Sequence, residues 1–255
     1  MGAYTRKETH EPLPVRSVSR SIDYRIIHPD YDVEAWEMDM MLLKLHGPVP
    51  EWIPRVRLND NNTLPLDGDD VTVIGLGRLD EDAKMGFPSV LQEVNVSVTE
   101  YETCNSEEMY RGFIDDPTMI CASVPEGGQD ACFGDSGGPL LQEMEDGVWT
   151  QVGVVSFGVG CARANRPGVY SRVSMAYDWI QDMICEHSDS KPASCPQLTR
   201  AFGQLSAAPS VAPSGNPSPA PSPGLRARDF TTKEKGRSFK PNTRTRKLPL
   251  PEEFP

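Results

Sequence analysis

Long apolar segments are missing from this sequence of 255 residues. It has no run of eighteen apolar residues, and a helix that crosses a membrane needs about that length or more. The opening residues, Met-Gly-Ala-Tyr-Thr-Arg-Lys-Glu, lack the apolar core that a secretory signal carries. We therefore expect no membrane span and no signal peptide in this chain.

Positive charge is scarce, because 25 Lys and Arg face 37 Asp and Glu, which gives a formal net charge of −12. Residues 223–255 hold nine basic and four acidic residues, so residues 1–222 carry −17. An acidic body argues against nucleic acid as the main partner and would attract basic substrates over distance. It fits a merely soluble acidic surface equally well.

Histidine is scarce too, with four residues in the whole chain. None stands beside cysteine, or beside another histidine, at the spacing of a metal site. We expect neither a metal nor another cofactor.

A serine stands between glycines in residues 130–139, Asp-Ala-Cys-Phe-Gly-Asp-Ser-Gly-Gly-Pro. Glycines allow backbone conformations that a Cβ forbids, and they bring amide N–H groups close to a reacting carbonyl. A lone Gly-x-Ser-x-Gly can equally be a turn in which Ser and Asp satisfy nearby backbone groups. The longer run here resembles the active-site signature of the trypsin-like serine endopeptidases, the chymotrypsin family.

The resemblance implies catalytic roles for residues on both sides of this signature. Ser136 corresponds to the nucleophile, and the N–H groups of Gly134 and Ser136 correspond to the oxyanion hole. Asp39, which by itself could be a strand cap or an edge charge, corresponds to the triad aspartate. Asp135 matches the carboxylate that pairs with the newly cut N-terminus on activation.

The resemblance also implies a binding pocket for basic side chains. Asp130 corresponds to the pocket floor, where a buried carboxylate needs a positive partner. The pocket-wall glycines correspond to Gly158 and Gly168. The segment that pairs with the substrate backbone corresponds to Ser156, Phe157 and Gly158. This combination implies cleavage after Arg or Lys.

Six cysteines indicate an oxidising, secreted context, and their spacing alone permits 15 pairings. The family resemblance implies the pairs Cys104–Cys121 and Cys132–Cys161, which leaves Cys185 and Cys195 to pair locally. A further bridge of the family would join the positions of Val71 and Gln142, where both cysteines are absent.

Alternating patterns predict strands, and one stretch predicts a helix. We expect strands at 17–20, 24–27, 71–77 and 90–98, and two more within 148–157. Ser174 is predicted to cap a helix from about 175 to 186 that places Trp179 and Met183 on one face. Two tripeptides, Asn61-Asn62-Thr63 and Asn95-Val96-Ser97, are glycosylation sequons if the chain is secreted.

Together these features predict an all-β, two-barrel trypsin-like fold with the first barrel incomplete. Residues 1–60 would hold the remnant of the first barrel and the inter-barrel connection, and 61–187 the second barrel plus a C-terminal helix. Residues 188–255, rich in Pro and Ser and then basic, are predicted to be a disordered, solvated tail.

The general base of the triad is missing from the sequence. The family carries it on an Ala-Ala-His-Cys-like motif well before the Asp39 strand, and no such motif occurs here. His10 has no flanking cysteine, His46 and His187 follow Asp39, and His28 matches a structural histidine of the family, which predicts a surface or turn position. We expect a fragment or a late start; a catalytically dead relative and a different base remain alternatives.

The function implied is peptide-bond hydrolysis after Arg or Lys through an acyl-enzyme at Ser136, in a secreted or extracellular protein. Its partners would be protein or peptide substrates and protein inhibitors, with no nucleic acid and no membrane. Without a base, Ser136 is a weak nucleophile. The competing hypothesis is an inactive protease homologue that serves as a protein-binding module.

Overall fold

A computed structural model of the chain describes residues 18–82 and 84–195. Its contacts divide the chain after Pro196, so every described residue belongs to the first unit. Two predictions fall largely outside this range: the tail at 188–255, of which only residues 188–195 are described, and the environment of His10. The elements in chain order are β1 (Ile22–Ile27), β2 (Met41–Leu45), β3 (Arg57–Leu58), β4 (Asp70–Gly75), β5 (Gln92–Thr99), α1 (Tyr101–Cys104), β6 (Met119–Ser123), β7 (Pro139–Glu143), β8 (Trp149–Phe157), β9 (Gly168–Arg172), the 3₁₀ helix η1 (Val173–Ala176) and α2 (Tyr177–His187).

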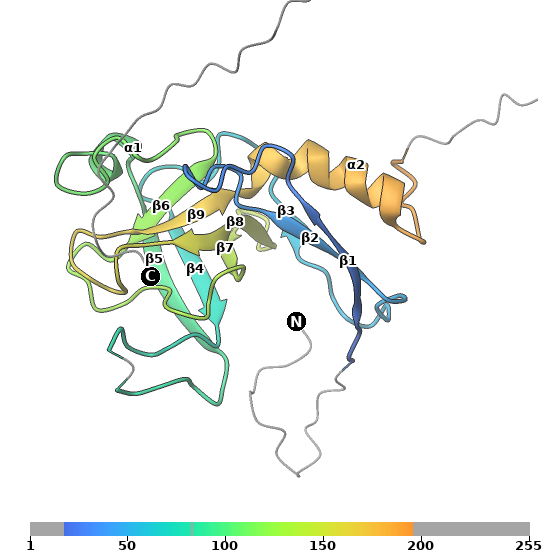
Figure 1. The fold of residues 1–255 in the computed structure, drawn as a ribbon, viewed down its shortest axis with the longest axis horizontal. Helices are drawn as coiled ribbons and strands as arrows, with labels where there is room; N and C mark the ends of the chain where they lie inside the picture. The colour runs from blue at the N-terminus through green and yellow to red at the C-terminus, as the bar shows by residue number, and fades with distance from the viewer. Residues whose placement is uncertain (1–17, 83, 196–255) are drawn as a thin grey trace, which may run out of the picture. The chain divides into compact units, whose positions relative to one another are not determined.

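Six of the described strands close into an antiparallel barrel. Their order is β8-β7-β4-β5-β6-β9, and β9 pairs back onto β8 to complete the ring. The two-residue strand β3 adds to β8 in parallel, at Arg57↔Thr150. Alternation along β4 and β5 sends Val71, Val73 and Val96 into the barrel core, as the period-two pattern predicts. Figure 1 shows the barrel strands gathered on the left of the view.

The first barrel is represented by a two-stranded sheet, in which β1 pairs antiparallel with β2. It lies beside α2 at the right of Figure 1. Met38 and Met40, at the entry to β2, pack with Val173 and Ile180 in a cluster that joins this sheet to the C-terminal helix. The expectation of an all-β fold with one incomplete barrel is confirmed.

Local predictions were wrong in three places. The two strands predicted within 148–157 are a single strand, β8. Residues 18–20 form no strand, and the first strand begins at Ile22. Ser174 does not cap the helix: it lies within η1, its buried Oγ has no hydrogen-bond partner in the described part of the chain, and α2 begins after Ala176 without a side-chain cap. The sequence pattern merged a 3₁₀ turn with the helix that follows it.

The longest described helix is α2, with 11 residues. In the part of the chain that the structure describes, no helix combines the length and apolar character needed to cross a membrane.

Candidate functional site

Ser136 lies exposed in the turn that leads into β7. The turn is fixed to β8 by two hydrogen bonds, in which the Gly137 N–H donates to the Val155 carbonyl and the Val155 N–H donates to the Gly138 carbonyl, both at 2.9 Å. Gly134 has φ +97°, a conformation that L side chains rarely adopt. Its N–H and that of Ser136 donate to no other described residue.

Asp39 is placed by contacts with the last two barrel strands. The Ser156 hydroxyl on β8 donates to Asp39 Oδ2 at 2.6 Å, and the Ser171 hydroxyl on β9 donates to the Asp39 carbonyl at 3.0 Å. The residues before it are bent, since Trp36 and Met38 have φ of +59° and +50°. Asp39 and the Ser136 turn are thus both attached to the same end of β8.

The side chains of the three described histidines contact neither Asp39 nor Ser136. His28 is buried in a turn, against the ring of Trp179 at 4.6 Å, and its Nδ1 accepts the Asp30 N–H. It is therefore a turn residue as expected, but not a surface one; burial lowers its pKa. His46 lies 2.8 Å from Asp23, and His187 lies 3.1 Å from the Tyr24 hydroxyl.

Asp130 lies largely buried between the two pocket-wall glycines and the 161–162 backbone. A Cβ built on Gly168 would lie 2.9 Å from Asp130 Oδ1, and a Cβ built on Gly158 would lie 3.8 Å from the Gly168 Cα. The two glycines therefore lie close to each other, and the absence of a side chain at Gly168 lets the Asp130 carboxylate approach its backbone.

The Asp130 carboxylate has only backbone donors. It accepts the N–H groups of Ala131 at 2.8 Å and Ala162 at 3.1 Å. Its pKa is raised to about 6, chiefly by burial and in small part by the nearby Asp135 carboxylate, while the two N–H bonds oppose the rise. A positively charged ligand would stabilise the ionised form of such a carboxylate.

Tyr170 is a buried neighbour of Asp130 and Gly168 that the sequence reading missed. A Cβ on Gly168 would lie 3.1 Å from the Tyr170 hydroxyl, which is fully buried and has no hydrogen-bond partner in the described residues. Burial and Asp130 both raise its pKa. Alternation could have identified it, because Tyr170 follows Gly168 by two residues on the same strand and so shares its face.

Asp135 points beneath the oxyanion turn. Its Oδ1 accepts the Gly77 N–H at 2.7 Å and its Oδ2 accepts the Cys132 N–H at 2.9 Å. A Cβ on Gly75 would lie 1.9 Å from Oδ1, so this approach requires glycine. A cavity of about 280 Å³ adjoins this carboxylate and Asp130.

Aromatic rings surround Phe157 at the end of β8. Trp36, Tyr110 and Phe113 each meet its ring edge to face, with centroids 5.3, 6.0 and 5.7 Å away. Sequence spacing gave no signal for this cluster, because its members come from two separate loops and a strand end.

The cysteines form three disulfides, Cys104–Cys121, Cys132–Cys161 and Cys185–Cys195. These include the two pairs that the family resemblance implies. Cys132–Cys161 joins the segment after Asp130 to the one that holds Ala162, so it ties together two walls of the pocket.

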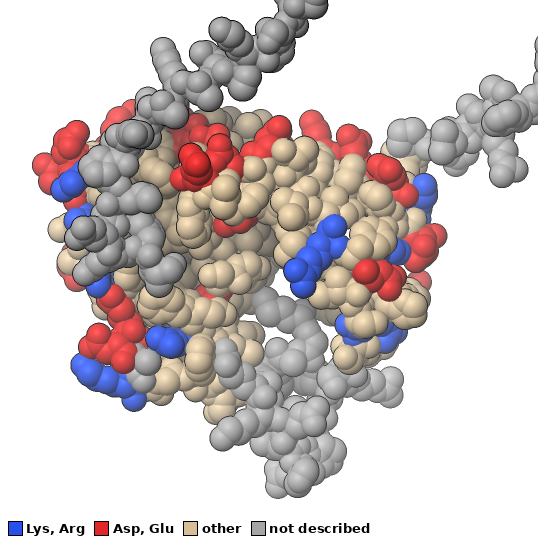
Figure 2. Space-filling view, viewed as in Figure 1, with Lys and Arg blue, Asp and Glu red and all other residues tan. Residues whose placement is uncertain are grey.

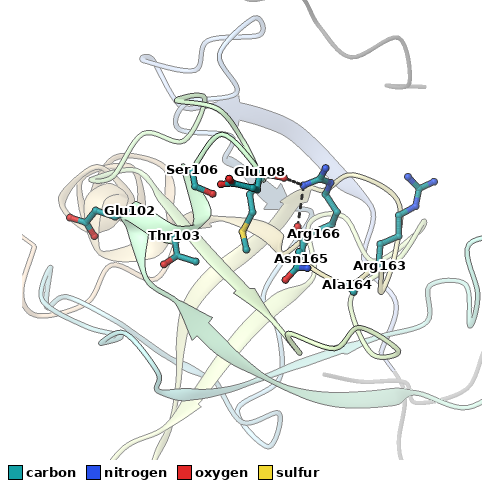
Figure 3. Close-up of a pocket in the computed structure, with 9 residues that line it drawn as sticks. Glu102, Thr103, Ser106, Glu108, Arg163, Ala164, Asn165 and Arg166 are labelled. Carbon is teal, nitrogen blue, oxygen red and sulfur yellow. Dashed lines mark hydrogen bonds between the residues drawn. The ribbon is translucent and has the colours of Figure 1, made fainter.

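A larger cavity, of about 840 Å³, contains none of the predicted site residues. Figure 3 shows Arg166 reaching to the backbone of Glu108, where its guanidinium donates to the carbonyl oxygen, while Arg163 points away. Arg163 pairs with Glu81. With two glutamates and two arginines on its lining, this cavity has no single charge preference.

Acidic side chains are spread over the surface. Figure 2 shows Asp and Glu along the upper edge of the view, over the barrel and α2, with fewer Lys and Arg among them. A field of this sign favours the approach of basic ligands.

The chain is similar to known serine proteases over most of its described length. A family model described as Trypsin matches residues 2–180. Serine proteinase stubble of Drosophila melanogaster is 40% identical over 190 residues, which cover 72% of this chain and 23% of that protein. Testisin of Homo sapiens is 40% identical over 158 residues, 60% of this chain and 50% of that protein.

Transmembrane protease serine 11C of Mus musculus is 40% identical over 163 residues, 63% of this chain and 37% of that protein. This chain therefore spans no more than half the length of these three relatives. Because the family model covers well over half of the chain, the chain belongs to the trypsin family of serine endopeptidases.

Proposed function

We propose that this chain provides the nucleophile, the triad aspartate and the primary pocket of a protease that cleaves after Arg or Lys. The observation that carries the proposal is the Asp130 carboxylate, which among the described residues accepts only backbone N–H groups and adjoins a cavity of about 280 Å³. A guanidinium or ammonium group there would supply the missing positive charge.

The chemistry proposed is acyl transfer. The Ser136 hydroxyl attacks the scissile carbonyl, and the N–H groups of Gly134 and Ser136 stabilise the oxyanion. Asp39 orients and stabilises an imidazolium, with the Ser156 hydroxyl holding its carboxylate in place. Asp135 would pair with a newly formed N-terminal ammonium and so support the oxyanion turn.

The setting proposed is extracellular, as three disulfides favour. Protein or peptide substrates with Arg or Lys, and protein inhibitors that present such a residue, are the partners proposed.

The pocket can be tested without catalysis, by titrating the chain with the fluorescent cation p-aminobenzamidine. We expect binding at pH 8 that Asp130→Ser weakens about 100-fold, because removing the partner of a buried charge costs about 3 kcal/mol or more. Ser136→Ala, which leaves the pocket unchanged, is the matched control. Equal affinity in the Asp130→Ser variant would rule out the proposed pocket.

A second candidate function is a non-catalytic protein-binding module. It is favoured by one observation: the side chains of the three described histidines contact neither Asp39 nor Ser136. On this reading the same pocket recognises a basic side chain without cleaving the peptide.

A fluorophosphonate probe tests whether a base is in place in the chain as it stands. We expect no labelling of Ser136, since no base takes its proton. Mass spectrometry of the 1–255 chain, with Ser136→Ala as background, gives the answer. Stoichiometric labelling of Ser136 in folded protein would show that a base is in place and would exclude the inactive module.

A further inference from the structure

Two sequons in this chain lie in opposite structural settings. Asn61-Asn62-Thr63 is in the turn between β3 and β4, whereas Asn95-Val96-Ser97 lies within β5. Both asparagines are exposed. We propose that Asn61 is an N-glycosylation site and that Asn95 is not. The inference rests on the extracellular setting of the proposed function, because glycans of this class are added in the secretory pathway.

The Asn61 turn already has the contact that sequon chemistry uses. The Thr63 hydroxyl donates to Asn61 Oδ1 at 2.8 Å, and the Thr63 N–H donates to the same oxygen at 3.0 Å. Both donors draw electron density from the carboxamide. Asn61 Nδ2, the atom that would receive the sugar, donates to no described residue.

A buried asparagine holds this turn from beneath. Asn59 is 3% exposed, and its Nδ2 donates to the carbonyls of Asn61 and Leu64, both at 3.0 Å. Its Oδ1 accepts the Asn61 N–H at 3.1 Å. These bonds use only the backbone of Asn61, so its side chain is left on the outer side. The acceptor conformation therefore persists after folding, and a glycan there displaces no contact of the core.

Asn95 has none of these features. Its Oδ1 accepts the Thr72 hydroxyl at 2.7 Å from the paired strand β4. The Ser97 hydroxyl donates instead to Asp70 at 3.2 Å. In an extended strand residues i and i+2 are about 6.6 Å apart, so the sequon hydroxyl cannot reach its asparagine. A sugar on Asn95 would also disrupt the contact with Thr72.

The transfer is a substitution at a sugar carbon. Asn61 Nδ2 forms a bond to C1 of an oligosaccharide carried on a polyprenyl pyrophosphate, and the C1–O bond breaks. The nitrogen loses one proton, and the lipid pyrophosphate leaves with the electron pair of the broken bond. The secretory compartment supplies this co-reactant and the transferase; the chain supplies a polarised, accessible carboxamide.

The experiment is to direct the full 255-residue chain into the secretory pathway of cultured cells with a heterologous leader. Lysate and medium are treated with peptide N-glycosidase, and the shift on a gel is compared with untreated samples. We expect one glycan, lost in Asn61→Gln and in Thr63→Ala and kept in Asn95→Gln. The Asn-to-Asp mass change after enzyme treatment identifies the residue.

A further variant distinguishes the effect of local backbone conformation from the effect of the hydroxyl residue type in the sequon. Ser97→Thr gives Asn95 the same hydroxyl residue type as Asn61, and we expect Asn95 to remain predominantly unmodified. No glycan, a glycan that persists in Asn61→Gln, or stoichiometric modification of Asn95 would overturn the proposal. The readout is a mass and does not depend on amidine binding, so this proposal and the pocket can fail separately.

Discussion

At the scale of single residues, Asp130 is held in an unfavourable state that a ligand can relieve. Its two N–H donors do not offset the burial of its charge, and the result is a pKa raised to about 6. Active sites commonly keep such uncompensated groups at a cost in stability. The pocket floor should therefore be both a binding determinant and a source of instability.

The change Asp130→Asn tests this cost. The folded-state pKa is raised above the usual 3.8, so the folded chain binds this proton more tightly than the unfolded chain does. The stability that the carboxyl contributes is full below about pH 4 and is lost as pH rises through about 6. The variant should gain about 2 to 3 kcal/mol in free energy of unfolding at pH 7.5, and nothing at pH 4.

Urea unfolding at the two pH values measures this difference. Asp116→Asn, which removes an exposed charge, is the control and should change little at either pH. An Asp130→Asn variant that is no more stable than the parent at pH 7.5 would show that the carboxylate is solvated or paired.

At the scale of elements, β4 and β7 are joined by a polar contact where the family resemblance implies a disulfide. The Gln142 Nε2 on β7 donates to Asp69 Oδ2 at 2.7 Å, just before β4. Gln142 Oε1 is buried and has no partner among the described residues. Because Thr72 pairs with Leu141, the register places Val71 opposite Gln142.

The double variant Val71→Cys with Gln142→Cys should therefore form a fourth disulfide. We expect a gain of about 2 to 4 kcal/mol in the free energy of unfolding, the typical effect of a bridge that closes a long loop. Thiol titration measures bond formation, and unfolding with and without reductant measures the gain. Two free thiols in the folded variant would contradict this register.

Sequence patterns predicted the barrel strands better than the features that depend on distant contacts. Buried alternation fixed β4 and β5 to within two residues, because the period-two pattern is local. The start of α2 was misplaced, because a buried Ser174 hydroxyl without a partner looks identical to a cap in the sequence. Trp36 and Phe113 gave no signal at all, since only the folded chain brings their rings to Phe157.

The features of the site fall into the same two groups, those predicted from a local motif and those that depend on distant contacts. The family resemblance assigned roles to Asp130, Asp135 and Ser136. It also assigned Gly168, whose missing side chain lets the Asp130 carboxylate come close. The hydrogen bonds from Ser156 to Asp39 and from Gly77 to Asp135 span more than fifty residues of sequence. Spacing along the chain contains no information about such pairs.

At the scale of the whole molecule, two regions of different character are joined through α2. The barrel has a continuous apolar interior, whereas the β1–β2 sheet is packed on one side only, through Met40 and Leu42 against the helix. Four large apolar residues of this sheet, Ile22, Ile27, Met41 and Leu43, are exposed. In the described part of the chain, β1 pairs with β2 alone.

Because this sheet is exposed, we expect the tendency of the protein to self-associate to depend on it. Among the described residues, the edge of β1 that faces away from β2 has no paired strand, and a strand of a neighbouring molecule can add to its N–H and C=O groups. Asp23 and Arg25, within β1, place charges of both signs along this edge, and such charges oppose association between copies. Salt screens them, because the Debye length falls to about 3 Å at 1 M. High ionic strength and high concentration should therefore favour self-association, even while the barrel remains fully folded.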